Sequence, residues 1–489
     1  MEFVPDICFV ASEIYPFSKT GGLADVMGIL PLTLHKMGYK VSVITPLYGR
    51  ISTSAYNPRL VYEDINVGYP WPGVTADVLR ADFKGMPVYF LDRGEYFDRR
   101  YHYCTYKGDY FDNCERFIFF CRAAMALIKA IGKAPRIVHS HDWHAALMSP
   151  YIYYQRRTDT YWKNTSTVFT IHNLAFQGRF SVRLFWDCGL PYEAWGMEGV
   201  EFYDSFNLLK GGITYSDKIT TVSPSYAEEI LTPEFGCGLE NVLQKRSKDL
   251  VGILNGSDYE VWDPSRDRYL AAGYSSSDLY GKQACKKELL DQLCLSEKLL
   301  YRPVLGFIGR FRSQKGIDLL TEIIPDIVRQ DVGVVLLGEG DAEYEAKLMN
   351  LVEAYHGHVA GIVGYTEEMA HKIQAGTDIF LMPSRYEPCG LTQMYSLRYG
   401  TPPVATAVGG LKDTIVPYPA EHSTGFVFPE PTTKAFWNAI QNALVLYQDT
   451  ESWKKMVVRG MQTDFSWTKS AREYVELYKQ IGYVLDEEV

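Results

Sequence analysis

Short apolar runs of strand length recur along the chain, and helical stretches separate them. Val and Ile occupy both alternating positions of these runs, as is typical of strands buried on both faces of a parallel sheet. The runs read ICFVAS, KVSVITP, MPVYFLD, RIVHSHD, STVFTIHN and KITTVSP in the first half, then PVLGFIGR, VGVVLLGEG, VAGIVGY, DIFLMPS and TPPVATAVGG. Strands that alternate with helices build βαβ units, so the pattern predicts an α/β fold with a doubly wound sheet in each half.

Two domains are predicted from the length of the chain and from one break in this pattern. A chain of 489 residues exceeds the size at which a single core keeps growing. The stretch VGILNGSDYEVWDP is rich in Gly, Asn, Asp and Pro and is interpreted as a linker, with the hinge near 253 to 264. We therefore expect domains at 1–252 and 253–466, followed by an amphipathic helix within 467–489 that need not pack on the domain before it.

The composition is that of a globular protein without a broad basic surface. Hydrophobic residues make up 47% of the chain and charged residues 22%, and the net charge is -10. This balance argues against nucleic acid or an anionic membrane as a partner, so any anion site must be built from a few placed cations. Nine cysteines without a CxxC pair indicate a reduced, cytosolic compartment.

Neither a secretory signal nor a membrane span is predicted. The stretch MEFVPDICFVASE carries an acid where a signal peptide carries positive charge. The longest apolar candidate, FIFFCRAAMALIKAIG, is interrupted by Arg122 and Lys129, which favours a buried amphipathic helix. We expect a soluble protein of the bacterial cytoplasm.

The stretch KTGGLAD places a cation beside two bare glycines at the start of a predicted helix. Lys19, Gly21, Gly22 and Asp25 follow the first apolar run. Backbone N–H groups at a helix N-terminus, with no side chains over them, suit a phosphate or another anion. The alternative is a tight strand-to-helix turn without a ligand, and Lys19 favours the anion site.

The stretch GRFRSQKG follows the first predicted strand of the second half and carries Arg310 and Lys315. Arg offers a bidentate fork and Lys a mobile point charge, which together suit a diphosphate leaving group. The alternative is a pair of solvated loop cations. Their place at the carboxyl end of a strand, where open α/β sheets bind ligands, favours the functional interpretation.

The stretch SRYEPCGLTQM ends one predicted strand and begins a helix. We therefore expect Glu387, Cys389, Gly390 and Leu391 in the first turn of that helix. A carboxylate there can accept hydrogen bonds from sugar hydroxyls, while the free amides that follow can contact sugar or phosphate oxygens. The alternative is that Glu387 merely caps its helix.

Polar residues also follow two neighbouring strands of the first half. His139, His141, Asp142 and His144 lie in HSHDWHAALM and resemble a metal cluster, but neither HExxH nor another firm ligand spacing occurs. We predict no metal site. Asp142 and His172, each at the end of its strand, are interpreted as residues that contact a neutral polyhydroxyl substrate.

One short motif occurs twice. GGLAD at 21–25 and GGLKD at 409–413 each follow a predicted strand and open a predicted helix. This equivalent placement hints at two related halves, although an echo of five residues can arise by chance. Because ligands of open α/β sheets bind at the carboxyl ends of the strands, we expect the active site between the halves.

In this order and at these separations, KTGGL, HDWH, IHN, GRFRSQKG, GYTEE and EPCGLTQ resemble the bacterial glycogen synthases and plant starch synthases. The match extends over nearly the whole chain. The resemblance implies a GT-B fold, with two Rossmann-like domains that face each other across a deep cleft and a C-terminal helix that crosses back to the N-terminal domain. It also implies transfer of glucose, usually from ADP-glucose, to the non-reducing end of an α-1,4-glucan with retention of configuration.

The resemblance implies which residues bind the sugar-nucleotide donor. Lys19 and Gly22 match the loop that reaches the donor, and Asp25 follows in the same motif. Arg310 and Lys315 match the pair that neutralises the distal phosphate.

The resemblance also implies contacts to the sugar, the base and the acceptor. Glu387 and the amides after it match the group that holds the transferred glucose, and His172 matches the histidine beside the anomeric carbon. Asp142 matches the aspartate of the acceptor side, and Tyr365 matches a residue near the adenine. Many retaining transferases of this fold carry a second glutamate at the position of Tyr395, a replacement that looks usual in the glycogen synthase branch.

The expected reaction needs neither a metal nor a cofactor. The two cations would stabilise the departing diphosphate, and the donor's own phosphate oxygen would take the acceptor proton. The alternatives are a phosphorylase-like enzyme that uses pyridoxal phosphate and a glucan-binding protein without activity. The sequence leaves open the choice between ADP-glucose and UDP-glucose and the oligomeric state.

Overall fold

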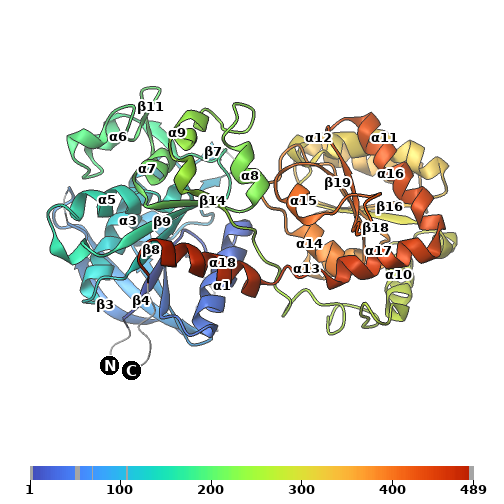
Figure 1. Ribbon diagram of the computed structural model, residues 1–489, viewed down its shortest axis with the longest axis horizontal. Helices are drawn as coiled ribbons and strands as arrows, with labels where there is room; N and C mark the ends of the chain where they lie inside the picture. Colours follow the sequence, from blue (N-terminus) through green and yellow to red (C-terminus); the bar gives the residue numbers. More distant parts are fainter. Residues whose placement is uncertain (1–3, 50–55, 69, 106–107, 484–489) are drawn as a thin grey trace. The chain divides into compact units, whose positions relative to one another are not determined.

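The computed structural model describes residues 4–49, 56–68, 70–105 and 108–483 (Figure 1). The chain forms two compact units. The ranges of unit 1 are Met1–Val222, Ala227–Ile253 and Ser470–Val489, and those of unit 2 are Ser223–Tyr226 and Leu254–Lys469. The last six residues of the predicted C-terminal segment lie outside the described part of the chain.

Unit 1 is built on a nine-stranded sheet (Figure 1). Its strands, in order across the sheet, are β14 (Leu250–Gly252), β13 (Lys218–Thr221), β9 (Ser166–Ile171), β8 (Ile137–His141), β1 (Ile7–Val10), β2 (Val41–Pro46), β5 (Met86–Asp92), β4 (Thr75–Phe83) and β3 (Arg59–Asn66). Neighbours are parallel except in the pairs β4–β5 and β3–β4. The six predicted strands of this half are all present, and their residues are nearly all buried.

The antiparallel edge was missed by the hydrophobic pattern. Most side chains of β3 are exposed, because this strand lies at the rim of the sheet and covers no core. An exposed edge strand carries no run of Val and Ile, so periodicity does not mark it. The first two residues of the stretch VGILNGSDYEVWDP belong to β14, which pairs with β13 as the last strand of unit 1.

The helices of unit 1 cover its sheet and connect its strands. They are α1 (Gly22–Lys36), α2 (Gly94–Phe97), α3 (Asn113–Ala130), α4 (Asp142–Ala145), α5 (Met148–Gln155), α6 (Arg183–Trp186), α7 (Leu208–Tyr215) and α9 (Glu240–Lys245), while α8 (Pro224–Glu229) begins in unit 2 and ends in unit 1. Two small sheets add β10 (Arg179–Ser181), β12 (Ser205–Asn207) and β11 (Glu201–Phe202), and β6 (Cys104–Thr105) with β7 (Gly108–Asp109). Helix α3 contains the longest apolar run, and among the described helices none is long and apolar enough to cross a bilayer.

The C-terminal helix α18 (Trp467–Gln480) begins in unit 2 and ends in unit 1. Its Tyr478 hydroxyl lies 2.8 Å from His139 Nδ1 on β8, and the Ser166 hydroxyl of β9 donates to the Ile481 carbonyl at 2.9 Å. In Figure 1 this helix is drawn beside β8. The end of the amphipathic segment therefore packs on the parallel strands of unit 1, and these two hydrogen bonds hold it there.

Unit 2 contains a six-stranded parallel sheet. Its strands, in order, are β17 (Val359–Val363), β16 (Gly333–Gly338), β15 (Val304–Ile308), β18 (Ile379–Met382), β19 (Pro403–Thr406) and β20 (Phe426–Phe428). Its helices are α10 (Tyr280–Gln292), α11 (Ile317–Arg329), α12 (Ala342–Ala354), α13 (Glu367–Gly376), α14 (Thr392–Arg398), α15 (Gly409–Thr414), α16 (Thr433–Gln448) and α17 (Thr450–Gln462). The five predicted strands of this half are present, and β20 was missed.

Each sheet has a point at which the strand order reverses. In unit 1, β2 lies on one side of β1, while β8 and β9 lie on its other side. In unit 2, β16 and β17 lie on one side of β15, and β18 lies on the other. Loops that leave the carboxyl ends of strands at such a switch point are splayed apart, which makes room for a ligand. The predicted site residues come mainly from these loops.

The remainder of the predicted linker is well packed in unit 2. The Trp262 ring lies between His371 and Tyr395, with ring centroids 3.7 and 4.0 Å away and nearly parallel planes. This sandwich buries Trp262 and accounts for the tyrosine at position 395, whose ring serves as one wall of the stack.

Candidate functional site

The loop between β1 and α1 is held by one buried carboxylate. Glu13 accepts hydrogen bonds from the Thr20 backbone N–H at 2.5 Å and from the Thr20 hydroxyl at 2.6 Å. It also accepts one from the Tyr103 hydroxyl at 2.6 Å. Because a buried charge requires such partners, Glu13 fixes the position of the residues that precede the two glycines. No motif marks Glu13, although it stands only six residues before Lys19.

Gly21 and Gly22 open α1 with bare backbone. Gly22 is the first helical residue, and Gly21 precedes it without a side chain that could cap the helix. A Cβ atom built on either glycine meets no described atom within 4 Å. Their backbones therefore have open space before them, and the amides of the first turn are accessible to an anion.

Lys19 and Asp25 lie together beside this turn. The Lys19 ammonium is 2.6 Å from Asp25 Oδ1, and the Lys19 side chain is about half exposed, with 48% of its surface accessible. An exposed ion pair contributes only about 0–1 kcal/mol, so the ammonium can exchange Asp25 for an anionic ligand at low cost. The structure thus brings together the four residues predicted in this motif.

Asp142 and His172 join the ends of β8 and β9. Asp142 directly follows β8 with a left-handed backbone, φ 54°, and its Oδ1 accepts a hydrogen bond from the His172 backbone N–H at 2.8 Å. Burial raises the pKa of Asp142 to about 7, against the opposing effect of the backbone hydrogen bonds from His172 and Asn173. A carboxyl group in this state changes its charge near neutral pH.

The His172 ring is neutral and contacts a second histidine. Burial lowers the pKa of His172 to about 3, so the ring carries no charge at neutral pH. Its Nε2 lies 2.9 Å from His141 Nδ1. The other two histidines of the motif have different partners, since His139 contacts Tyr478 and Thr170, and His144 stacks near Tyr103. Among the described residues no three His, Cys, Asp or Glu side chains are grouped so that they could hold a metal ion.

The cation site of unit 2 begins directly after β15. Arg310 is exposed in this loop, and Lys315 ends a short 3₁₀ helix, Ser313–Lys315, just before α11. The Lys315 ammonium lies 2.5 Å from Glu387 Oε2, which also accepts a hydrogen bond from the Ser384 hydroxyl at 3.2 Å. One ion pair therefore links the loop after β15 to the loop after its neighbour β18, at the switch point of the sheet.

The prediction that Glu387 to Leu391 form the first turn of a helix is wrong. Helix α14 begins at Thr392, and the preceding residues form a loop. Gly390 has φ 70°, in the left-handed region that interrupts a right-handed helix. The Gln393 side chain donates hydrogen bonds to the carbonyls of Cys389 and Gly390, at 3.0 and 2.9 Å. Glu387 consequently does not cap α14, and its carboxylate is held by Lys315 instead.

A second glycine pair holds this loop in place. The Gly410 N–H donates to the Glu387 carbonyl at 3.2 Å. A Cβ on Gly409 would lie 2.1 Å from the Glu387 carbonyl oxygen, and one on Gly410 would lie 2.0 Å from that of Cys389. Burial raises the pKa of the Cys389 thiol, which marks a packed side chain and not a nucleophile. The loop can approach α15 this closely only because both positions lack a side chain.

Both glycine motifs follow a strand and open a helix, as predicted, but they lie at different places in the strand order of their sheets. GGLAD follows β1 at the switch point of its sheet, whereas GGLKD follows β19, the fifth strand of unit 2. The structural counterpart of β1 in unit 2 is β15, its first strand and switch point. The Lys315 loop, which follows β15, therefore takes the place in unit 2 that GGLAD has in unit 1.

Tyr365 lies apart from the ion pair in the sheet. It follows β17, an edge strand two places from β15, and its side chain is exposed. Its predicted contact with the adenine stays a prediction.

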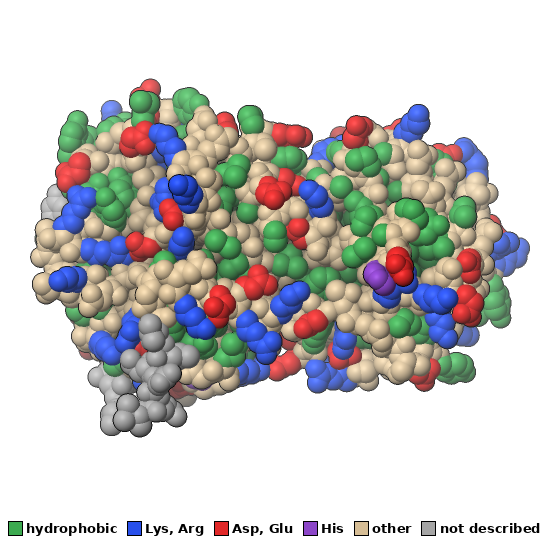
Figure 2. All heavy atoms as spheres, in the orientation of Figure 1, with side chains coloured by type: hydrophobic (Ala, Val, Ile, Leu, Met, Phe, Trp, Pro, Cys, Tyr) green, Lys and Arg blue, Asp and Glu red, His purple; other side chains and the backbone are tan. Residues whose placement is uncertain are grey.

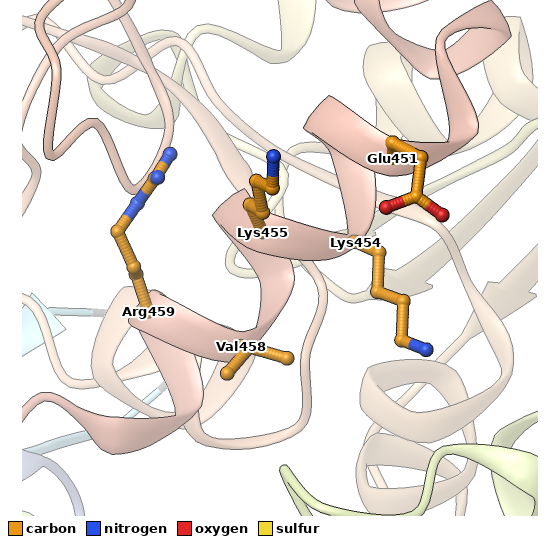
Figure 3. A pocket seen from close by; sticks show the side chains of 5 residues that line it. All are labelled: Glu451, Lys454, Lys455, Val458 and Arg459. Carbon is orange, nitrogen blue, oxygen red and sulfur yellow. The ribbon is translucent and has the colours of Figure 1, made fainter.

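Outside the predicted site, the face drawn in Figure 2 carries charges of both signs, and basic and acidic side chains alternate there. A hollow of about 360 Å³ on α17 is lined by Glu451, Lys454, Lys455, Val458 and Arg459. Figure 3 shows the ends of Lys454 and Lys455 pointing to opposite sides of the helix, so these charges do not converge. The hollow contains none of the predicted site residues.

Comparison with known proteins defines the class and then the family. Residues 6–245 match the family described as starch synthase catalytic domain, and residues 296–457 match glycosyl transferases group 1. Together with the two mainly parallel sheets, these matches make the chain a glycosyltransferase of the GT-B fold.

The individual relatives are more specific. Glycogen synthase of Anaeromyxobacter sp. (strain Fw109-5) is 44% identical over 98% of this chain and 99% of its own. Glycogen synthase of Geotalea daltonii is 43% identical over 97% of this chain and 98% of its own. The catalytic domain of starch synthase IV from Arabidopsis thaliana, solved with ADP and acarbose, has a TM-score of 0.90 and 32% identity, over 98% of this chain and 99% of that one. The chain belongs to the glycogen and starch synthase family.

Proposed function

We propose that this chain transfers glucose from ADP-glucose to the non-reducing end of an α-1,4-glucan with retention of configuration. The observation that carries the proposal is the Lys315–Glu387 pair at the switch point of unit 2, in a chain of this family. The pair offers an ammonium for phosphate oxygens and a carboxylate for sugar hydroxyls within one hydrogen-bond distance.

Leaving-group stabilisation is the proposed task of the cations in unit 2. When the glucosyl–phosphate bond breaks, negative charge collects on the departing diphosphate. Arg310 and Lys315 would neutralise this charge where it develops, and Glu387 would orient the glucose through its hydroxyls. When the diphosphate binds, the Lys315 ammonium would contact a phosphate oxygen as well as Glu387.

The proposed tasks of unit 1 concern the donor loop, the sugar and the acceptor. The open amides of Gly21 and Gly22, with Lys19, would contact the donor. The neutral His172 ring would contact the transferred glucose, and Asp142 would bind a hydroxyl of the acceptor glucan. Retention would follow if the donor's own phosphate oxygen accepts the proton of the attacking hydroxyl on the same face of the sugar.

The decisive assay measures ADP release and glucan growth with glycogen as acceptor. We expect ADP-glucose to be used in preference to UDP-glucose, and the new linkage to keep the α configuration. Release of glucose 1-phosphate that requires inorganic phosphate, together with the absorption of pyridoxal phosphate, would instead identify a phosphorylase-like enzyme. Glucan binding without ADP release would identify a non-catalytic protein.

Two variants from one loop test the role of the cations. Arg310→Ala is expected to lower kcat about 10²- to 10³-fold, the usual effect of losing one group that stabilises developing charge. Arg312→Ala is the matched control, because Arg312 is an exposed cation of the same loop, 3.9 Å from Asp341. Equal activity of the two variants would remove Arg310 from the proposed mechanism.

The proposal includes neither a metal nor a cofactor. Activity is therefore expected to survive complete chelation of divalent metals, and loss of activity that Mg²⁺ or Mn²⁺ restores would contradict this part. The proposed partners are a sugar nucleotide and an α-1,4-glucan, without nucleic acid or membrane. The bacterial relatives support a place in the bacterial cytoplasm.

A further inference from the structure

Behind His172 lies a second, fully buried histidine. His141 is the last residue of β8, which runs parallel to β9, and His172 follows the end of β9. The two rings meet edge to edge, with His141 Nδ1 2.9 Å from His172 Nε2. None of the residue roles described above uses His141.

The His141 ring is packed against two other rings. It stacks on His139, with ring centroids 4.3 Å apart, and on Phe9 at 5.7 Å. His139 is in turn held by the Tyr478 hydroxyl at Nδ1 and by the Thr170 hydroxyl at Nε2, at 2.8 and 2.6 Å. Both nitrogens of His139 are thus occupied, and His141 is left with His172 as its hydrogen-bond partner.

The direction of the hydrogen bond follows from the second nitrogen of His141. Burial lowers the pKa of His141 well below its usual value, and that of His172 to about 3, so each neutral ring carries one proton. His141 Nε2 is buried and has no hydrogen-bond partner among the described residues. Buried N–H groups without an acceptor are rarer than unpaired acceptors. The proton of His141 is therefore on Nδ1, and the bond runs from His141 Nδ1–H to His172 Nε2.

This direction determines what His172 can offer a ligand. Because its Nε2 accepts, the proton of His172 is on Nδ1. The side chain is partly exposed, so Nδ1–H is a donor for a ligand atom. We propose that His141 is a positioning residue that holds His172 in the Nδ1–H tautomer, so that His172 donates a hydrogen bond to an oxygen of the transferred sugar. This inference rests on the proposed function only for the identity of that sugar.

Substitutions at His141 test the positioning role. His141→Leu removes the donor and is expected to lower kcat about 10- to 100-fold, the range known for losing the second partner of a metal-ligating histidine. KM for ADP-glucose should change less than kcat. His141→Asn places an amide N–H near the former Nδ1 and should restore kcat to within a few-fold of the wild type.

A matched control separates positioning from packing. Tyr478→Phe removes the hydroxyl from the next histidine of the same buried chain, and it should lower Tm while leaving kcat unchanged. If Tyr478→Phe lowers kcat as much as His141→Leu does, the effect is one of packing and the proposal fails. It fails equally if His141→Leu folds and retains full kcat.

The tautomer can be measured without any assay of activity. In wild-type protein labelled with ¹⁵N-histidine, long-range ¹H–¹⁵N spectra distinguish protonated from unprotonated ring nitrogens, and loss of one signal set in His172→Gln assigns His172. We expect an unprotonated Nε2 and a protonated Nδ1. The opposite pattern overturns the proposal. Because this measurement uses the wild-type protein, it decides the question even if His141→Leu does not fold. The expected pattern in a protein that releases no ADP would instead refute the proposed function and leave the positioning geometry standing.

Discussion

The glycine pairs at 21–22 and 409–410 look alike in sequence and serve opposite purposes. Around Gly21 and Gly22 the structure leaves open space, whereas Gly409 and Gly410 touch the carbonyl groups of the Glu387 loop. The first pair keeps backbone accessible, as a ligand site requires, and the second allows two backbones to pack. A glycine motif therefore indicates a bare backbone, and its surroundings decide whether bareness serves binding or folding.

This comparison is sharpest at Gly22 and Gly410, which both lie at the start of a helix with ordinary backbone angles. An alanine at each position asks the same question in two environments.

Gly410→Ala is expected to have the largest effect. Its Cβ would lie 2.0 Å from the Cys389 carbonyl oxygen, and this clash is with backbone, which cannot swing aside. The free energy of unfolding should fall by about 3 kcal/mol, the upper range of overpacking, and kcat should fall more than about 100-fold as the Glu387 loop moves. Denaturant unfolding and the ADP-release assay measure both. Wild-type stability would show that this pair is not required for packing.

Asp142→Asn is expected to raise stability while lowering activity. The pKa of Asp142 is raised from 3.8 to about 7 in the folded state, so ionisation costs stability as pH rises through that window. Asn avoids this cost, tolerates the left-handed backbone and still accepts from the His172 N–H. The gain should be absent below pH about 4 and reach ~2 kcal/mol above pH about 7, less than the full pKa change implies because the side chain is partly exposed.

Tm of both forms between pH 4 and 8 measures this difference. A gain that is constant across the range would mean that the carboxyl of Asp142 titrates normally. If the variant also retained full activity with glycogen, Asp142 would have no part in acceptor binding.

Gly22→Ala is expected to have the smallest effect on the fold and a selective one on the donor. Its Cβ meets no described atom within 4 Å, and Ala favours a helix over Gly by up to ~1 kcal/mol, so stability should stay equal or rise. A methyl group in the ligand's path should nevertheless lower kcat/KM for ADP-glucose about tenfold, or ~1.4 kcal/mol. Thermal unfolding and initial rates separate the two effects, and unchanged kcat/KM would place the donor elsewhere.

The strands and the chemistry-bearing motifs were predictable because each has a local cause. Runs such as KVSVITP are buried on both faces, and their apolar character is visible without a structure. The edge strand β3 was missed since it buries little, and the start of α14 was misplaced because Gly390 adopts a left-handed backbone that residue identity permits but does not require. No motif marks Glu13, and HDWH contains His141 without showing what it contacts, because the roles of the two residues depend on partners 7 and 31 residues away.

By itself, the sequence determined the α/β class, the family and the residue types that the site needs, since these depend on periodicity and on short motifs. Only the tertiary structure decided which partner each residue has: that Lys315 pairs with Glu387, that GGLKD supports a loop while GGLAD leaves a backbone open, and that one buried histidine lies against another. Hydrogen bonds and steric contacts act over a few ångströms in space. The separation of two residues along the chain does not report that distance until the fold is complete.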